Sequence, residues 1–322
     1  MLDAAFHGDA SQKARPAKIF IDGEAGTTGL QIRERLRRRK DVALLTISAQ
    51  SRKDVGAKRE LLREADLAIL CLPDDAARES VALIDDLGRD GPRIIDASTA
   101  HRTAPGWIFG FPEMVRGQAD AIRKAPKVAN PGCYPTAAIA LLRPLVDAGF
   151  IAADHPITIN AVSGYSGGGK SMIAAYEGGG APAFELYGLG FEHKHIPEIL
   201  AYSGLTRRPI FIPSVGNFRQ GMLVSVPLHL GLLAGEPSAA DLEAALRAHY
   251  GEGGAVSVIA LDPPNSLERL EAEELNGTNI LEIRVVASKK HPLAVLIAKL
   301  DNLGKGASGA AVQSMDLMLD LA

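Results

Sequence analysis

The chain has 322 residues, of which 47% are hydrophobic and 23% charged, a composition typical of a globular enzyme and unlike that of a disordered or fibrous chain. Its formal net charge of -3 and its pI near 6.3 give no broad basic field, so we do not expect it to bind nucleic acid or an anionic membrane surface. The length favours two domains and a core that needs no disulfides. We therefore expect a small-molecule partner.

The first residues do not resemble an export signal, because acids and a histidine replace the basic start and apolar centre of a secretory peptide. We interpret residues 1–17 as a disordered lead. The most apolar later stretch, residues 221–234, contains a proline and a histidine and is shorter than the ~20 residues of a membrane span. We predict a cytoplasmic protein in which Cys71 and Cys133 are free thiols.

The first 130 residues alternate short apolar runs with segments of helical length, a pattern typical of a doubly wound parallel sheet. Strands are predicted at residues 18–22, 42–48, 66–73 and 92–98, and a helix at residues 31–40. This half is predicted to bind a nucleotide.

The pattern changes at Cys133, which precedes an apolar helix at residues 137–146. Longer alternating strands follow, and they predict an α+β domain on a largely antiparallel sheet. Helices are expected near residues 171–178, at 239–250 with Ser238 as N-cap, and at 308–321. We divide the chain into a nucleotide-binding domain, residues 18–132 plus 303–322, and a catalytic and dimerisation domain, residues 133–302.

A glycine-rich turn follows the first predicted strand and leads into a helix. Gly23, Gly26 and Gly29 have the spacing GxxGxxG, and Thr27 and Thr28 lie between them. Glycines let backbone N–H groups approach a pyrophosphate, whose charge the helix N-terminus favours. The alternative is a tight strand-to-helix turn without a ligand. The position after the first strand favours dinucleotide binding.

The end of the second predicted strand selects between NAD and NADP. An NAD-binding chain would place an acid here for the ribose hydroxyl. This chain has Ser51, Arg52 and Lys53, and a hydroxyl with two cations suits a 2′-phosphate. The alternative is a solvated surface loop. We predict NADP(H).

Cys133 is the candidate nucleophile. It lies between a short strand and a helix with Pro135 near its first turn, where the helix dipole and free N–H groups would stabilise a thiolate. A buried structural role is the alternative, and we assign that role to Cys71 within its apolar strand.

The proton partner of this thiol is expected in the segment GFEHKHIPEI. His193 and His195 lie in the connection that enters a helix at Pro197, and at least one is predicted to be the general acid/base. The sequence does not separate the two. A metal pair is the alternative, but no third Cys or His ligand lies nearby and Glu192 and Glu198 read as flanking residues, so we predict no metal.

A second glycine-rich segment, residues 163–170, follows a predicted strand. Ser163 and Gly164 begin it, and its backbone N–H groups suit an anion or substrate cradle. Residues 164–171 also satisfy the letters GxxxxGK[ST]. We reject an NTPase reading, because the parallel layers and the later acidic strand of such a protein are missing here.

The motifs NPGCYPT, SGYSGGGK, HKHIPEI and DNLGKGASGAAVQ, with the first glycine turn, together resemble the N-acetyl-γ-glutamyl-phosphate reductase family, in its shorter type. This family is related to aspartate-semialdehyde dehydrogenase. The resemblance implies a Rossmann-like domain joined to an α+β domain of glyceraldehyde-3-phosphate dehydrogenase type. It also implies NADPH-dependent reduction of N-acetyl-L-glutamyl 5-phosphate to the 5-semialdehyde in arginine biosynthesis, through a thioester on Cys133.

The same resemblance implies roles for three further residues. Arg102 matches a substrate-side arginine, Asn302 a residue near the nicotinamide, and Arg219 a less securely aligned substrate arginine. A homo-oligomer, dimer or tetramer, is also implied. The alternatives are a related acyl-phosphate reductase, acting on aspartyl or aminoadipyl phosphate, and a non-catalytic NADP-binding sensor.

Overall fold

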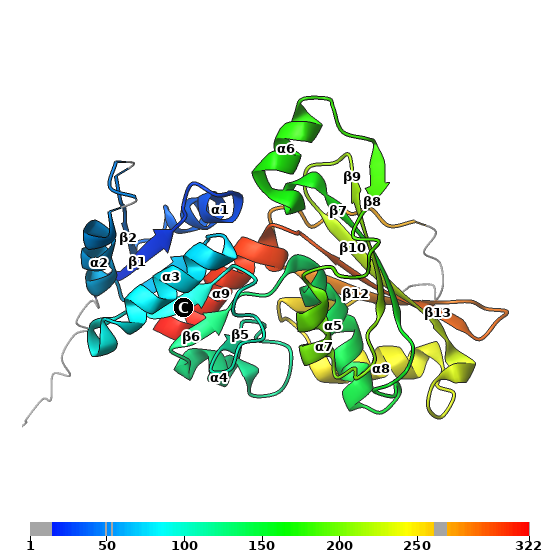
Figure 1. Cartoon of the computed structure of the whole chain (residues 1–322). Coiled ribbons are helices and arrows are strands. Elements are labelled where there is room, and N and C mark those ends of the chain that lie inside the picture. The colour runs from blue at the N-terminus through cyan, green and yellow to red at the C-terminus, as the bar shows by residue number, and fades with distance from the viewer. Residues whose placement is uncertain (1–14, 49, 53, 261–268, 322) are drawn as a thin grey trace, which may run out of the picture.

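The computed structural model describes residues 15–48, 50–52, 54–260 and 269–321, which form two sheets and the helices around them (Figure 1). The first sheet is parallel, in the order β2-β1-β3-β4-β6-β5. Its strands are β1 (Ala17–Asp22), β2 (Val42–Leu45), β3 (Leu67–Leu70), β4 (Arg93–Asp96), β5 (Ile108–Phe109) and β6 (Lys127–Ala129). Its helices are α1 (Thr27–Leu36), α2 (Val55–Glu64), α3 (Asp74–Asp85) and α4 (Gln118–Lys124).

This half confirms the predicted doubly wound parallel sheet. All four residues of β3 are buried, as expected for a strand covered on both faces. Helix α1 begins at Thr27, inside the glycine turn, rather than at residue 31. Strand β2 ends at Leu45, before the predicted end at residue 48. Residues 46–48 and 50–52 therefore belong to the loop that leaves this edge of the sheet.

The second sheet is mixed and has the order β11-β12-β13-β10-β7-β9-β8. Its strands are β7 (Thr158–Gly164), β8 (Phe184–Leu186), β9 (Ile210–Gly216), β10 (Met222–His229), β11 (Val256–Val258), β12 (Leu281–Ala287) and β13 (Leu293–Leu300). The helices of this half are α5 (Cys133–Asp147), α6 (Gly169–Glu177), α7 (Ile196–Ser203) and α8 (Ala239–Tyr250). The expected antiparallel pairing holds except that β7 pairs parallel with β9 and β11 with β12.

Helices α5, α7 and α8 lie together on one side of this sheet (Figure 1). Helix α5 is apolar around most of its circumference, and its buried residues join the inner faces of β10, β12 and β13 in one hydrophobic core. Helix α8 begins with the predicted N-cap, where Ser238 and Asp241 form a capping box.

Both ends of the described chain return to the first sheet. Ala17 already pairs with β2, and Arg15 donates hydrogen bonds of 2.7 and 2.9 Å to Asp66, so the predicted disordered lead is wrong for these residues. Residues 1–14 lie outside the described residues. At the other end, a π-helical turn (Gly304–Ser308) leads into α9 (Gly309–Leu319), which contacts α1, α4 and β4.

A buried ion pair ties this return segment to the first half of the chain. The Lys305 side chain is 1% exposed, and Nζ donates to Glu113 Oε2 at 2.8 Å and to Gln313 Oε1 at 2.7 Å. Gln313 in turn donates to Glu113 Oε1 at 2.7 Å. Burial lowers the pKa of Lys305, and the neighbouring carboxylate opposes that shift.

We expect Glu113→Ala to destabilise the protein by about 3 kcal/mol, because the ammonium group of Lys305 would then stay buried without its counter-ion. The double variant with Lys305→Met should lose much less, since no unpaired charge remains. Urea unfolding followed by the fluorescence of Trp107, the single tryptophan, measures both losses. Strictly additive effects of the two substitutions would contradict this account.

Candidate active site around Cys133

A cavity of about 370 Å³ contains Cys133 and is lined by residues that follow strands of the first sheet, such as Ala97 and Asn130, and by strand residues of the second sheet, such as Ser163 and Val215. Four helices begin at its wall: α1 at Thr27, α5 at Cys133, α6 at Gly169 and α7 just after His195. None of the four has a side-chain cap at its N-terminus. Because the free N–H groups and dipoles of helix starts favour negative charge, the cavity suits anionic ligands.

Two glycines allow the backbone to close around Cys133. A Cβ on Gly132 would lie 2.7 Å from Arg102 Nη1 and from His195 Nε2. On the other side, a Cβ on Gly306 of the returning segment would lie 2.7 Å from Cys133 Cβ. Only glycine fits at these two positions without a shift of its neighbours.

The thiol of Cys133 is protonated in the ligand-free protein. Burial raises its pKa to about 11, and the opposing contributions of backbone N–H groups at the start of α5 and of Arg102 are smaller. The stabilised thiolate expected from the helix N-terminus is therefore not the resting form. A neighbouring base has to remove the proton when the sulfur reacts.

His193 and His195 both line the cavity. Burial lowers the pKa of His193 to about 4 and the pKa of His195 well below its usual range, so both imidazoles are neutral near pH 7. The backbone N–H of His195 donates to His193 Nδ1 at 3.2 Å. His193 packs among aromatic rings, with its centroid 5.6 Å from that of Tyr187 and 5.2 Å from that of Phe211. Buried neutral imidazoles can accept a proton from the thiol.

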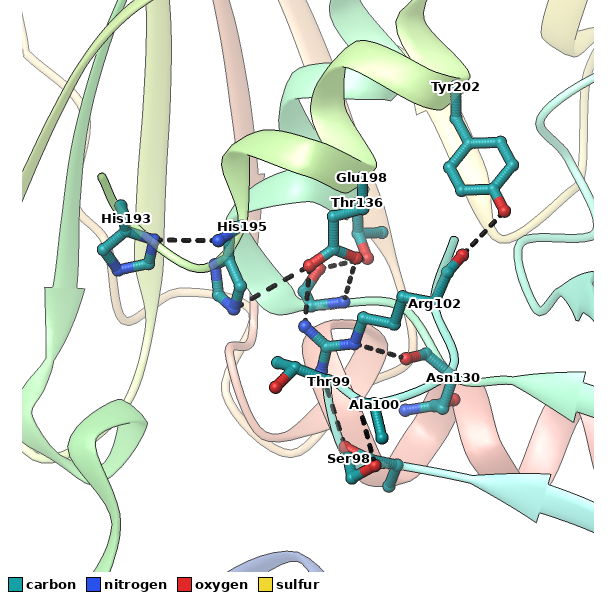
Figure 2. A network of polar contacts seen from close by, with 12 residues as sticks. Ser98, Thr99, Ala100, Arg102, Asn130, Thr136, His193, His195, Glu198 and Tyr202 are labelled. Atoms are coloured by element: carbon teal, nitrogen blue, oxygen red, sulfur yellow. Dashed lines mark hydrogen bonds and ion pairs between the residues drawn. The ribbon is translucent and has the colours of Figure 1, made fainter. Parts of the chain in front are cut away.

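Glu198 is the acid at the centre of the polar network in Figure 2. Its side chain is 1% exposed; Oε1 accepts from Arg102 Nη1 at 2.6 Å, and Oε2 accepts from the N–H of Gly132 at 3.0 Å. His195 Nε2 lies 4.0 Å from Oε1. The interpretation of Glu198 as a flanking residue is therefore wrong. Its position among the apolar residues of α7, three after His195, is the signal that could have identified it.

Arg102 lines the cavity but is held by protein groups. Besides Glu198, its Nε donates to the carbonyl oxygen of Asn130 at 3.1 Å, and Tyr202 donates to the Arg102 carbonyl at 2.6 Å. The remaining guanidinium nitrogen, Nη2, makes only a weak contact, 3.5 Å from the carbonyl oxygen of Ala97. This nitrogen is the part of the guanidinium left to contact a ligand.

The first glycine turn fits a dinucleotide. Gly23 has φ +86°, and a Cβ there would lie 2.3 Å from the carbonyl oxygen of Cys71. A Cβ on Gly29 would lie 2.6 Å from the carbonyl oxygen of Gly23. The turn is therefore as compact as the motif predicts. Gly26, the N-cap of α1, supplies no side chain, and the first turn of α1 has no acid. Thr27 and Thr28, the first residues of α1, line the cavity, so the free N–H groups of the first turn of α1 are available to a diphosphate.

Ser51 and Arg52 lie in the loop after β2. Ser48 and Ser51 share a hydrogen bond of 3.0 Å between their hydroxyl groups, and Arg52 is exposed. Lys53 lies outside the described residues. Asp22, the acid at the end of β1, is buried. It accepts a hydrogen bond from the Ser80 hydroxyl at 2.8 Å and forms an ion pair with Lys58 at 2.9 Å.

The second glycine-rich segment forms another part of the cavity wall. Ser163 and Gly164 line the cavity, and the loop is held by backbone bonds to residues 218–221. The guanidinium of Arg219 pairs with Glu177 on the surface and is not among the cavity-lining groups. Asn302 lines the cavity, but its amide already accepts from the N–H of Gly221 at 2.8 Å and donates to Ser166 at 3.0 Å.

The cavity thus collects most of the predicted site residues. Those that line it are Thr27, Thr28, Arg102, Cys133, Ser163, Gly164, His193, His195 and Asn302. Gly23, Gly26, Gly29, Ser51, Arg52 and Arg219 lie outside its wall. Lys194 and Tyr187 also line it and were not predicted.

Comparison with known proteins agrees with this arrangement. Residues 133–302 match the family described as semialdehyde dehydrogenase, dimerisation domain. The chain is 55% identical to the N-acetyl-gamma-glutamyl-phosphate reductase of Chelativorans sp. (strain BNC1) and 52% identical to that of Brucella ovis. Each alignment covers 94% of this chain and 98% of the relative.

Solved structures share the fold at low identity. Aspartate semialdehyde dehydrogenase II of Vibrio cholerae, complexed with ASA, has a TM-score of 0.71 at 16% identity over 95% of this chain and 99% of that one. The Candida albicans enzyme with NADP has a TM-score of 0.64 at 14% identity over 94% and 98%. Both confirm the predicted pair of a parallel-sheet domain and a mixed α+β domain. The sequence relatives confirm the resemblance, and the chain belongs to the N-acetyl-gamma-glutamyl-phosphate reductase family.

Proposed function

We infer that this chain is an NADP-dependent oxidoreductase of arginine biosynthesis that reduces N-acetyl-L-glutamyl 5-phosphate to N-acetyl-L-glutamate 5-semialdehyde and phosphate. The names of relatives at 52–55% identity support the reaction. The observation that carries the chemistry is a half-buried thiol in the same cavity as two neutral imidazoles and four uncapped helix starts.

The first step is attack of Cys133 on the acyl phosphate. As the sulfur–carbon bond forms, the thiol proton passes to an imidazole, and the carbon–oxygen bond to phosphate breaks, leaving a thioester on Cys133. The imidazolium then protonates the departing phosphate. The first N–H groups of α5 have no carbonyl partner within the helix and can hold the oxyanion formed during attack.

The second step releases the aldehyde. NADPH, when bound, would supply a hydride to the thioester carbon, which leaves the alkoxide of a thiohemiacetal on Cys133. The thiohemiacetal oxygen then reforms a carbonyl while the bond to sulfur breaks. Cys133 leaves as a thiolate and regains a proton taken from solvent through the imidazole, which accounts for the one proton that the overall reduction consumes.

We propose His195 as this general acid/base. It is 7% exposed, its Nε2 points toward Gly132 beside Cys133, and Glu198 lies near enough to stabilise the imidazolium. His193 would position it, since His193 Nδ1 accepts the backbone N–H of His195.

Ligand contacts are proposed for the remaining predicted residues. The turn of Gly23, Gly26 and Gly29 with Thr27 and Thr28 would hold the diphosphate, and Ser51 and Arg52 the 2′-phosphate. Asn302 would lie near the nicotinamide, and Arg102, Ser163 and Gly164 near the substrate. Arg219 would act only through its backbone, which supports the Gly164 loop.

The two-domain division of the chain remains a proposal. Residues 18–132 with 303–322 carry the parallel sheet and α9, and residues 133–302 carry the mixed sheet. The matched family is described as a dimerisation domain, which supports oligomerisation of this chain. We propose self-association through the sheet face not covered by α5, α7 and α8. Apolar residues on this face include Phe184, Leu186, Ile212, Leu223, Val295 and Ile297.

No helix in the described ranges is long and apolar enough to cross a bilayer.

Replacement of the nucleophile tests the reaction and the mechanism together. We expect the wild-type enzyme to reduce NADP with N-acetylglutamate semialdehyde in the presence of phosphate, and Cys133→Ser to lose this activity by at least about 10³-fold because a hydroxyl is a far weaker nucleophile. NADPH affinity should stay within twofold. Absorbance at 340 nm and fluorescence titration measure the two quantities.

The matched control is Cys71→Ala, which removes the other thiol and should keep activity. Substantial turnover by Cys133→Ser would refute the thioester. Wild-type turnover with aspartate semialdehyde alone would move the enzyme to the related reductase, and silence with both aldehydes would favour a non-catalytic NADP-binding protein.

The raised pKa of Cys133 predicts slow alkylation at neutral pH. With a pKa of about 11, roughly one thiol in 10⁴ is ionised at pH 7, and the labelling rate by iodoacetamide should rise about tenfold per pH unit up to pH 10. Mass spectrometry of the Cys133 peptide in the ligand-free protein follows this rate. A fast rate that levels off near pH 7 would show a stabilised thiolate instead.

Arg52→Ala tests recognition of the 2′-phosphate. The variant should bind NADPH about tenfold more weakly, because a charge-assisted hydrogen bond to phosphate is lost, while NADH binding stays unchanged. Arg89→Ala, in the exposed 3-10 turn Gly88–Asp90 before β4, is the control for loss of a surface cation. Equal effects of Arg52→Ala on both cofactors would place recognition of the 2′-phosphate elsewhere.

A further inference from the structure

Among the described residues, one cation that lines the Cys133 cavity forms no ion pair within 4.0 Å. Among the described residues that line the cavity, only Arg102 and Lys194 carry a formal charge once the histidines are neutral. Arg102 is paired with Glu198 at 2.6 Å, and both groups are buried. Lys194 therefore supplies the net charge that a ligand in this cavity meets.

The acids near Lys194 are already occupied. Its charge makes a small contribution to the lowered pKa of Asp74. Burial raises the pKa of Glu198, and the charge of Lys194 is one of the smaller contributions that oppose this shift. Both carboxylates therefore lie within the field of Lys194. Asp74, however, accepts from the N–H and the hydroxyl of Thr99 at 2.9 and 2.6 Å, and Glu198 accepts from Arg102 and Gly132. In the described part of the chain, Lys194 has no ion pair within 4.0 Å.

The position of Lys194 in the chain adds to this argument. It lies between His193 and His195, directly before the N-cap of α7. It is exposed and is one of the residues that line the cavity. Burial is the main cause of the low pKa of His193, and the positive charge of Lys194 lowers this pKa further. A bound anion would lie beside both the ammonium group and the imidazoles.

We infer that Lys194 binds an oxyanion of the acyl-phosphate substrate, either its phosphoryl group or its carboxylate. The inference rests on the proposed function, because that reaction brings a multiply charged anion to Cys133. An ammonium group with free donors stabilises such a group by a charge-assisted hydrogen bond. Arg102, whose charge Glu198 compensates, would contribute hydrogen bonding from Nη2 but little net charge.

The reverse reaction separates the two sources of the oxyanion, because phosphate and aldehyde are then separate substrates. In Lys194→Met we expect the KM of one of them to rise at least about tenfold while the KM of NADP stays within twofold. A rise for inorganic phosphate assigns the phosphoryl group, and a rise for N-acetylglutamate semialdehyde assigns the carboxylate. Lys194→Arg should recover most of the loss, since it restores the charge.

Lys290→Met is the matched control. Lys290 is an exposed cation in the connection between β12 and β13. It precedes the start of β13, whereas Asn302 follows the end of that strand, so the loss of Lys290 should leave every KM unchanged. Values within twofold of wild type for both phosphate and aldehyde in Lys194→Met would overturn the inference. A fall in kcat alone, with both KM values unchanged, would also overturn it. Wild-type enzyme that is silent in the same assay would instead refute the proposed function.

Discussion

The geometry around Cys133 depends on one buried carboxylate. Glu198 connects three parts of the chain: Arg102 after β4, the Gly132 turn before α5, and α7, which carries it. A charge this deeply buried is tolerable only when its partners are fixed. The same contacts that satisfy Glu198 therefore also set the positions of the thiol and of His195.

Burial gives this site a neutral resting state. The raised pKa of Cys133 and the lowered pKa of His195 favour an uncharged pair over a thiolate and an imidazolium. The positive charge that the site offers to a ligand lies at its wall, in the starts of α1, α5 and α6 and in Lys194. Such an arrangement stabilises negative charge brought by a ligand, and it leaves the thiol unreactive until that ligand arrives.

Features that depend on neighbours in the chain were predictable from the sequence. The turn of Gly23 to Gly29 and the placement of Cys133 at a helix start follow from local backbone preferences, and the structure has both. Glu198 was missed because its role arises from Arg102, 96 residues away. The protonated thiol was missed for the same reason, since burial by distant segments outweighs the local effect of the helix N-terminus.

The return of the chain after β13 has a consequence for biosynthesis of the protein. Gly306 packs against Cys133, the carbonyl of Ala307 accepts from Asn130 at 3.0 Å, and α9 covers the first sheet. The wall behind the thiol is thus made from residues near the end of the sequence. A nascent chain in which both sheets are already translated still lacks that wall, so the thiol acquires its environment only after residues 306 and 307 have also left the ribosome.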